Sequence, residues 1–193
     1  MARERLTGPY LDAMKLLAIS GSLRLASSNS RVIAALERLA PDGVSVAIYR
    51  GLNDLPHFNP DLDGETPPAA VADLRRRVGE ADGLIICSPE YAHGVAGVMK
   101  NALDWLVPSV EFPQIPVALI NAAPHAHFAQ DHIRETLTVM SSRLVEDACV
   151  TVPMAGRPIG PEEIAADPEL GAILRGSLES LVEAVRRFGP RAI

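Results

Sequence analysis

The chain has 193 residues, a formal net charge of −6, and a composition of 48% hydrophobic and 22% charged residues. This length predicts one full-sized domain, and the composition excludes a largely disordered chain. The negative charge argues against a nucleic-acid partner, because affinity for phosphates comes from clustered Lys and Arg. No stretch of the sequence approaches the roughly 20 apolar residues of a membrane helix, so we expect no membrane partner either.

The N-terminal segment, residues 1–14, is mixed polar and charged, and it has no apolar core typical of a secretion signal. We expect it to form an arm ahead of a single domain that covers residues 15–193. The two cysteines, Cys87 and Cys149, each lie in an apolar run typical of a buried strand. Such cysteines usually act as small hydrophobic side chains, which predicts free thiols and a reducing, cytoplasmic location.

From Lys15 onward, short aliphatic runs alternate with amphipathic segments of helical spacing. The predicted strands are Leu16–Ser20, Val44–Tyr49, Gly83–Ser88, Pro116–Asn121 and Leu144–Val152, and the predicted helices are Asn29–Leu39, Ala69–Ala81, Gly97–Leu106, Ala129–Ser141 and Leu170–Phe188. The alternation is typical of parallel βαβ units and predicts an α/β fold with helices on both faces of a parallel sheet. Ligands of such folds bind at the carboxyl ends of the strands, so the loops after the first, third and fourth strands are the candidate site.

A polar loop joins the first predicted strand to the first predicted helix. Its sequence is Ser20-Gly21-Ser22-Leu23-Arg24-Leu25-Ala26-Ser27-Ser28-Asn29-Ser30. A helix N-terminus favours an anion, and hydroxyl donors with a guanidinium complete a site for a dianionic phosphate monoester. The glycine patterns of nucleotide triphosphatases and of Rossmann dinucleotide sites are absent. The alternative is that Ser27, Ser28 or Asn29 only caps the helix.

The other two loops carry rings and small residues. The third strand ends in Ser88-Pro89-Glu90-Tyr91-Ala92-His93-Gly94, where an aromatic side chain and an imidazole on a turn offer a surface for a flat heterocycle. The fourth strand is followed by Asn121-Ala122-Ala123-Pro124-His125-Ala126-His127. Together with His132 these histidines suggest a metal, but a metal site needs three or four convergent ligands, so we expect none here.

Two motifs resemble the NADPH-dependent FMN reductase family, which includes quinone, chromate and azo-dye reductases. The first is Gly21-Ser22-Leu23-Arg24-x-x-Ser27-x-Asn29, and the second combines Pro89-Glu90-Tyr91 with Lys100-Asn101-Ala102-x-Asp104-Trp105. The resemblance extends from about Leu16 through Val152. It implies a three-layer, flavodoxin-like fold with a five-stranded parallel sheet in the order 2-1-3-4-5.

The resemblance also implies a binding site for FMN. The residues implied are Ser22, Arg24, Ser27 and Asn29 around the phosphate, Pro89, Glu90, Tyr91, Ala92 and His93 along the isoalloxazine, and Asn121 and Ala123 in the third loop. Ala92 stands where the family frequently has Asn, and the third loop lacks the glycines that the family often places there. The helix residues Lys100, Asn101 and Asp104 are interpreted as structural.

The activity that the resemblance implies is an NAD(P)H-dependent flavin oxidoreductase. NADPH or NADH would stack its nicotinamide near Tyr91 and His93, pass hydride to flavin N5, and leave the electrons for a small acceptor such as a quinone. This transfer requires no protein base, so no catalytic residue is assigned. The alternatives are a flavodoxin-like electron carrier and a flavin-binding regulatory module without turnover.

The family commonly completes its flavin sites with a neighbouring subunit, which implies a homodimer or homotetramer. The expected contact region contains Trp105, Val107, Val110 and Phe112. Trp105 itself is expected either in the core or in this interface, since large aromatic residues serve packing first.

Overall fold

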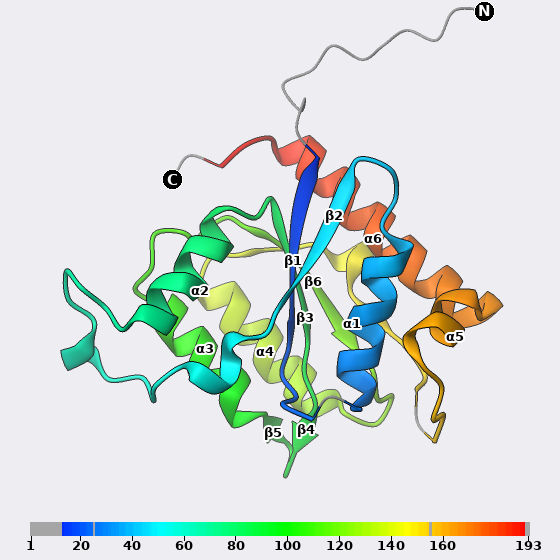
Figure 1. Ribbon diagram of the computed structural model, residues 1–193, viewed down its shortest axis with the longest axis horizontal. Helices are drawn as coiled ribbons and strands as arrows, with labels where there is room; N and C mark the ends of the chain where they lie inside the picture. Colours follow the sequence, from blue (N-terminus) through cyan, green and yellow to red (C-terminus); the bar gives the residue numbers. More distant parts are fainter. Residues whose placement is uncertain (1–12, 25, 155, 192–193) are drawn as a thin grey trace, which may run out of the picture.

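The computed structural model describes residues 13–24, 26–154 and 156–191. A parallel sheet crosses the middle of the molecule, and its strands lie in the order β2-β1-β3-β6-β7, with β8 pairing with β6 (Figure 1). The strands are β1 (Met14–Ser20), β2 (Val44–Tyr49), β3 (Gly83–Cys87), β6 (Pro116–Asn121), β7 (Arg143–Leu144) and β8 (Val150–Thr151). The order confirms the predicted 2-1-3-4-5 arrangement, with β6 as its fourth strand.

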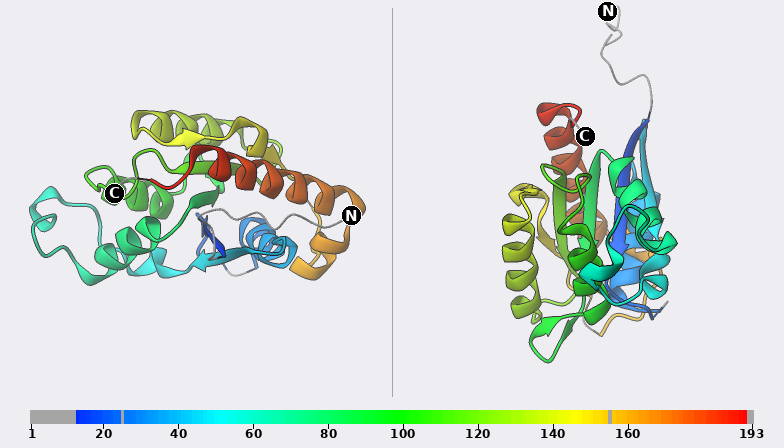
Figure 2. Two further views of the ribbon diagram at one scale, coloured as in Figure 1. Left: turned by 90° about the horizontal axis from the view of Figure 1, so that it is seen from above. Right: turned by 90° about the vertical axis from the view of Figure 1, so that its left-hand side faces the viewer.

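Helices cover both faces of this sheet. They are α1 (Ser28–Leu39), α2 (Ala69–Gly79), α3 (Gly97–Leu106), α4 (His127–Val139), α5 (Pro161–Ala166) and α6 (Pro168–Phe188). The apolar sides of α1 and α6 pack in one buried cluster against one face, and those of α2, α3 and α4 pack in a second cluster against the other face. Figures 1 and 2 show α1 and α6 together on one side of the strands and α2 and α3 on the other. The three-layer, flavodoxin-like architecture is thereby confirmed.

The central strand β3 is buried along its whole length, as expected for a strand covered on both faces. It pairs with β1 on one side and with β6 on the other. Each buried Leu or Ile side chain of such a strand contributes about 1.5–3 kcal/mol. The sheet therefore holds the carboxyl ends of β1, β3 and β6 side by side, and their loops meet at one edge.

The fifth strand differs from the prediction. The sequence predicts one strand over Leu144–Val152, but the chain forms β7, a 3-10 turn at Glu146–Ala148, and β8. The backbone moves away from β6 at this turn, and Cys149 Sγ accepts a hydrogen bond from Leu119 N at 3.4 Å. Ser177 Oγ on α6 donates to Ala148 O at 2.6 Å. Side-chain hydrogen bonds thus replace ladder bonds at the interruption, one with Cys149 within this segment and one with Ser177 on α6, and a hydropathy pattern does not encode such contacts.

Two short elements are absent from the sequence prediction. A hairpin of β4 (Glu90–Tyr91) and β5 (Gly94–Val95) follows β3, and α5 precedes α6. Helix α5 begins with Pro161, and the Glu163 carboxylate accepts from Gly160 N at 2.7 Å. At the start of the sheet, β1 begins at Met14 rather than at Leu16. Residues 1–12 of the predicted arm lie outside the described residues.

The connection at residues 50–68 packs over α3. Asn101 accepts from Phe58 N at 2.8 Å and donates to Pro56 O at 2.9 Å, and Trp105 Nε1 also donates to Pro56 O at 2.8 Å. The Trp105 ring is fully buried and meets the Phe58 ring edge-on, with the centroids 5.0 Å apart. These contacts confirm the structural interpretation of Asn101.

In the expected subunit-contact region, Phe112 is wrong because it is buried, and Trp105 takes the core position that was one of its two expected places. Trp105 is covered by the connection over α3, and Phe112 is buried in the same apolar cluster. Val107 and Val110, by contrast, are exposed. The difference arises because sequence hydropathy does not show which apolar side chains a distant loop will cover. No helix among the described residues is long and apolar enough to cross a membrane.

Candidate functional site

The loop after β1 is held by hydrogen bonds between its own hydroxyl groups. Ser27 is the N-cap of α1, and its Oγ accepts from Ser30 N at 3.1 Å. Ser27 Oγ donates to Ser30 Oγ at 2.9 Å, and the Ser30 hydroxyl lies 3.3 Å from Arg24 O and 3.2 Å from Ser20 Oγ. The capping role considered for Ser27 is therefore real. The additional hydroxyls fix the loop that precedes the cap.

Gly21 brings this loop against the end of β3. Gly21 N donates to Cys87 O at 2.8 Å, continuing the sheet by one bond. A Cβ at Gly21 would lie 2.3 Å from Ser88 Oγ and 3.0 Å from Ser88 Cα, so only glycine fits without a shift of the neighbouring backbone. The first and second loops are thus in direct contact.

Asn29 and Cys87 fix each other inside this contact. Cys87 Sγ donates to Asn29 Oδ1 at 3.1 Å, and both residues are buried. Burial raises the pKa of the Cys87 thiol to about 12, so the thiol keeps its proton and remains a donor at neutral pH. Because the oxygen of the Asn29 amide is engaged, its Nδ2 group is left as a donor toward an anion.

The loop after β3 folds into the β4–β5 hairpin. Ala92 and His93 have φ values of 49° and 59°, as in a type I′ turn, which requires positive φ at both central residues. The Glu90 carboxylate accepts from Ala129 N, in the first turn of α4, at 2.9 Å. The His93 ring stacks on Phe128 of the same helix, with the centroids 4.2 Å apart. The hairpin is therefore anchored to α4.

The loop after β6 is shaped by one side chain. Asn121 Oδ1 accepts from Ala123 N at 2.9 Å, and Asn121 Nδ2 lies 3.4 Å from Ala126 O. Asn121 is buried, whereas Ala123 is exposed. The side-chain amide of Asn121 thus bonds to backbone groups of the turn and holds its shape, although the turn contains no glycine.

These three loops border one cavity of about 260 Å³ at the carboxyl ends of the strands. Most of the predicted site residues line it, namely Ser22, Arg24, Ser27, Asn29, Pro89, Glu90, Tyr91 and Ala123. Ala92, His93 and Asn121 do not line it. Three further residues line the cavity without having been predicted from the sequence, namely Ser28, Ala122 and Ala126. The two alanines could have been predicted from the sequence, because small residues in a loop beside the motif allow a ligand to approach closely.

The chemistry of this cavity fits a phosphate monoester joined to a flat ring. The guanidinium of Arg24 is exposed and forms no ion pair with any described carboxylate. The cavity also receives the N-terminus of α1, where free backbone N–H groups favour an anion, and the donor group of Asn29. Tyr91, which is 62% exposed, also lines the cavity. The lining therefore combines groups that suit a dianion with an aromatic surface.

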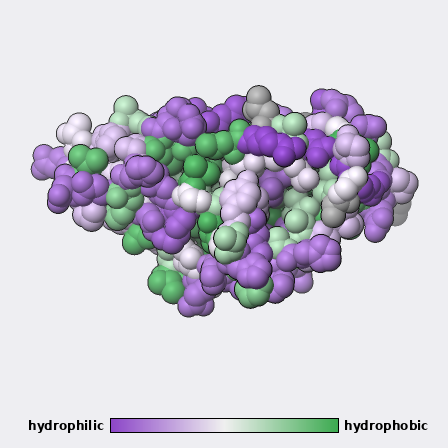
Figure 3. Space-filling view, turned by 90° about the horizontal axis from the view of Figure 1, so that it is seen from below, coloured by the Kyte–Doolittle hydropathy of each residue, from purple (hydrophilic) through white to green (hydrophobic). Residues whose placement is uncertain are grey.

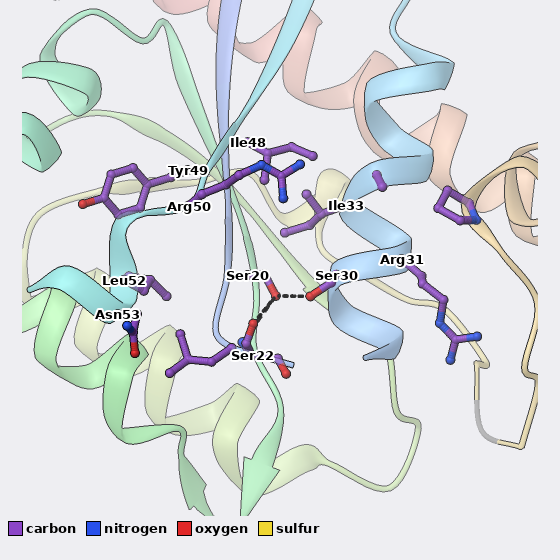
Figure 4. Close-up of a pocket in the computed structure, with 13 residues that line it drawn as sticks. Ser20, Ser22, Ser30, Arg31, Ile33, Ile48, Tyr49, Arg50, Leu52 and Asn53 are labelled. Carbon is purple, nitrogen blue, oxygen red and sulfur yellow. Dashed lines mark hydrogen bonds between the residues drawn. The ribbon is translucent and has the colours of Figure 1, made fainter. Parts of the chain in front are cut away.

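A second cavity, of about 620 Å³, lies on the other side of Ser22, between α1 and the end of β2. Ser20, Ser22, Ser30, Ile33, Ile48 and Arg50 are among its lining residues (Figure 4). Figure 3 views this edge of the molecule and shows hydrophobic residues in hollows between hydrophilic ones. This cavity was not predicted from the sequence. The sequence feature that pointed to it was Arg50, a charged residue directly after a predicted strand.

The histidines of the third loop lie apart from any metal-like cluster. His125 and His127 are exposed beside the first turn of α4, and His132 is exposed on the same helix. Among residues 13–24, 26–154 and 156–191, no group of three or more His, Cys, Asp or Glu is arranged to hold a metal ion.

Known proteins resemble this chain in sequence and in structure. Residues 14–157 match the family described as NADPH-dependent FMN reductase. An NAD(P)H-dependent FMN reductase of Pseudomonas aeruginosa is 31% identical over 182 residues, covering 92% of this chain and 98% of the relative. A quinone reductase of Escherichia coli is 28% identical, covering 92% and 95%. Among solved structures, the flavoenzyme NAD(P)H:(acceptor) oxidoreductase of Paracoccus denitrificans superposes with a TM-score of 0.75 at 26% identity, covering 92% of this chain and 100% of that chain. The chain belongs to the NADPH-dependent FMN reductase family.

Proposed function

We propose that this protein is an NAD(P)H-dependent oxidoreductase that binds FMN in the smaller cavity and reduces a small acceptor such as a quinone. The observation that carries the proposal is the meeting of Arg24, the α1 N-terminus and the Asn29 amide with the hairpin after β3. Family membership supports FMN and a nicotinamide coenzyme, and the quinone reductases among the relatives support the acceptor class.

The residues of the site bind and orient, and none is assigned a proton-transfer role. FMN, when bound, supplies the chemistry that takes hydride from the coenzyme and passes electrons to the acceptor. Arg24 and the first turn of α1 bind the phosphate, which fixes one end of the ligand. Pro89 and Tyr91 border the ring end, and the Glu90 bond to Ala129 N holds their hairpin in place. Ala92, His93 and Asn121 remain proposed parts of the flavin environment.

The test begins with the purified protein. We expect a yellow protein whose released chromophore is FMN, and loss of flavin absorbance on mixing with NADPH or NADH without air. Steady coenzyme oxidation should then follow when 1,4-benzoquinone is added. A flavin that is bleached only by a reduced protein partner would support the electron carrier instead. A bound flavin that neither coenzyme nor partner reduces would support the regulatory module.

We also propose a homodimer or homotetramer in a reducing, cytoplasmic compartment. Val107 and Val110 are 61% and 72% exposed near the end of α3, which supports a contact at this corner. Cys87 and Cys149 are both free thiols, as expected where disulfides do not form. Size-exclusion chromatography with light scattering tests the assembly, and Val107→Asp with Val110→Asp should shift it toward the monomer. A monomer at every concentration would contradict the assembly.

A further inference from the structure

The larger cavity has the surface of a nucleotide subsite. Leu23, which is 50% exposed, and Ile48 on β2, which is half-buried, offer apolar surface on which a flat base can pack. Ser20, Ser22 and Ser30 line it together: Ser20 Oγ lies 3.2 Å from Ser30 Oγ and accepts from Ser22 N at 3.3 Å, as the dashed lines in Figure 4 show. Its volume of about 620 Å³ lies within the usual range for small-molecule sites, about 300–1,000 Å³.

The charge at this cavity has no partner within the described chain. At this edge of the sheet, Arg31 donates to Ile159 O at 2.7 Å, and Arg157 pairs with Asp167. Arg24 and Arg50 alone among these four form no ion pair and donate no side-chain hydrogen bond to a described residue. Arg24 lines the smaller cavity, and Arg50 lines the larger one. Two free guanidiniums on opposite sides of Ser22 are suited to two separate anionic groups.

One phosphate of FMN accounts for only one of these guanidiniums. The α1 N-terminus and Asn29 place that phosphate beside Arg24. The larger cavity instead meets α1 at Ser30, whose backbone N–H is already bound by Ser27 Oγ, and at Ala34, one turn further along the helix. A second anion must therefore come from another ligand, and a nicotinamide coenzyme carries the flat base, ribose and phosphates that this surface suits.

We propose that the larger cavity binds the adenosine end of NADPH and that Arg50 binds the 2′-phosphate, which makes the enzyme prefer NADPH to NADH. The inference rests on the proposed function, because it extends the same coenzyme from the flavin across Ser22. Arg50 directly follows β2. In dinucleotide-binding folds built from the same βαβ units, an Arg near the ribose accommodates the 2′-phosphate. NADH has no group for this guanidinium to bind.

Steady-state kinetics of the FMN-loaded protein with both coenzymes test the assignment. For Arg50→Ala, we expect KM for NADPH to rise about 10–100-fold, the effect of one lost charge-assisted contact, with KM for NADH and kcat unchanged. Arg50→Lys should keep part of the preference, because it retains the charge but not the planar fork. Arg186→Ala, which removes an exposed charge on α6 far from both cavities, is the matched control and should change nothing.

Binding without turnover gives an independent measurement. Calorimetric titration with adenosine 2′,5′-bisphosphate should show binding to the wild type and a similar loss of affinity in Arg50→Ala. Ala34→Leu, which fills the cavity without removing charge, should weaken this ligand and both coenzymes while leaving FMN affinity intact.

Three results would overturn the inference. They are equal kcat/KM for NADPH and NADH in the wild type, an equal change for both coenzymes in Arg50→Ala, and a loss of FMN affinity in that variant, which would place the flavin in the larger cavity. A wild type that oxidises neither coenzyme would instead overturn the proposed function. The calorimetric titration would still decide whether the larger cavity binds an adenosine 2′-phosphate.

Discussion

The loops after β1 and β3 border the same cavity but are held in place by different means. The β1 loop is fixed from within, through the hydroxyls of Ser20, Ser27 and Ser30. The β3 loop is fixed from outside, through the bond of Glu90 to α4 and a turn with positive φ at Ala92 and His93. The part that binds charge thus depends on local side chains, whereas the part that borders the ring depends on backbone shape and on a distant helix.

The largest expected effect comes from removing the contact between the two loops. Gly21→Ala places a Cβ 2.3 Å from Ser88 Oγ and 3.0 Å from Ser88 Cα. We expect a loss of about 1–3 kcal/mol in unfolding free energy, typical of overpacking, together with weaker FMN binding. Denaturant unfolding and flavin fluorescence titration measure the two effects. Gly97→Ala is the control, because a Cβ there meets nothing within 4 Å. Equal stability of the two variants would show that the loops do not need to touch.

The next effect isolates the charge-binding loop. Arg24→Ala should weaken FMN about 10–100-fold, the effect of one charge-assisted contact, while leaving the melting temperature of the apoprotein unchanged, since Arg24 pairs with no described carboxylate. Riboflavin, which lacks the phosphate, should bind wild type and variant alike. Undiminished FMN affinity in Arg24→Ala would remove the phosphate from this loop.

A smaller effect isolates the anchor of the ring-binding loop. Glu90→Gln keeps an acceptor for Ala129 N but removes the charge that a helix N-terminus favours. We expect a loss of about 0.5–1.5 kcal/mol in unfolding free energy, because a charge-assisted bond becomes a neutral one. Glu135→Gln, on the exposed side of the same helix, is the control. Thermal unfolding followed by circular dichroism measures both. If the two variants melt together, Glu90 is not the anchor.

The smallest effect concerns backbone shape alone. Ala92→Gly and Ala92→Asn each suit the left-handed conformation better than Ala, so each should stabilise the hairpin by up to about 1 kcal/mol. Ala92→Asn also restores the residue that the family frequently has. The same Gly substitution at exposed Ala72 within α2 should instead destabilise by about 1 kcal/mol. Destabilisation at both positions would contradict the turn geometry.

The sequence predicted the features that depend on local patterns. Aliphatic runs located β1, β2, β3 and β6, and the polar motif located the loop in which Ser27 caps α1 and Arg24 faces the cavity. The missing features depend on distant contacts. The fifth strand is interrupted where Cys149 and Ser177 supply hydrogen bonds, and no run of apolar residues records this.

The site shows the same division. The orientation of the Asn29 amide is set by Cys87, and these two residues are far apart in the sequence. The larger cavity arises only when α1 lies beside the end of β2. Neither feature has a local pattern that could reveal it, which is why the sequence suggested one phosphate loop and not two neighbouring cavities.

Because the fifth strand is interrupted, the two edges of the sheet differ in how readily a strand of another chain can pair with them. Strands β7 and β8 are two residues each, too short to template a foreign strand, whereas β2 is a continuous strand of six residues with Ser45 and Ala47 exposed. Unprotected border strands are where ordered aggregation starts. Amyloid-like growth of this protein would therefore begin along β2, and Ala47→Lys would slow it without touching either cavity.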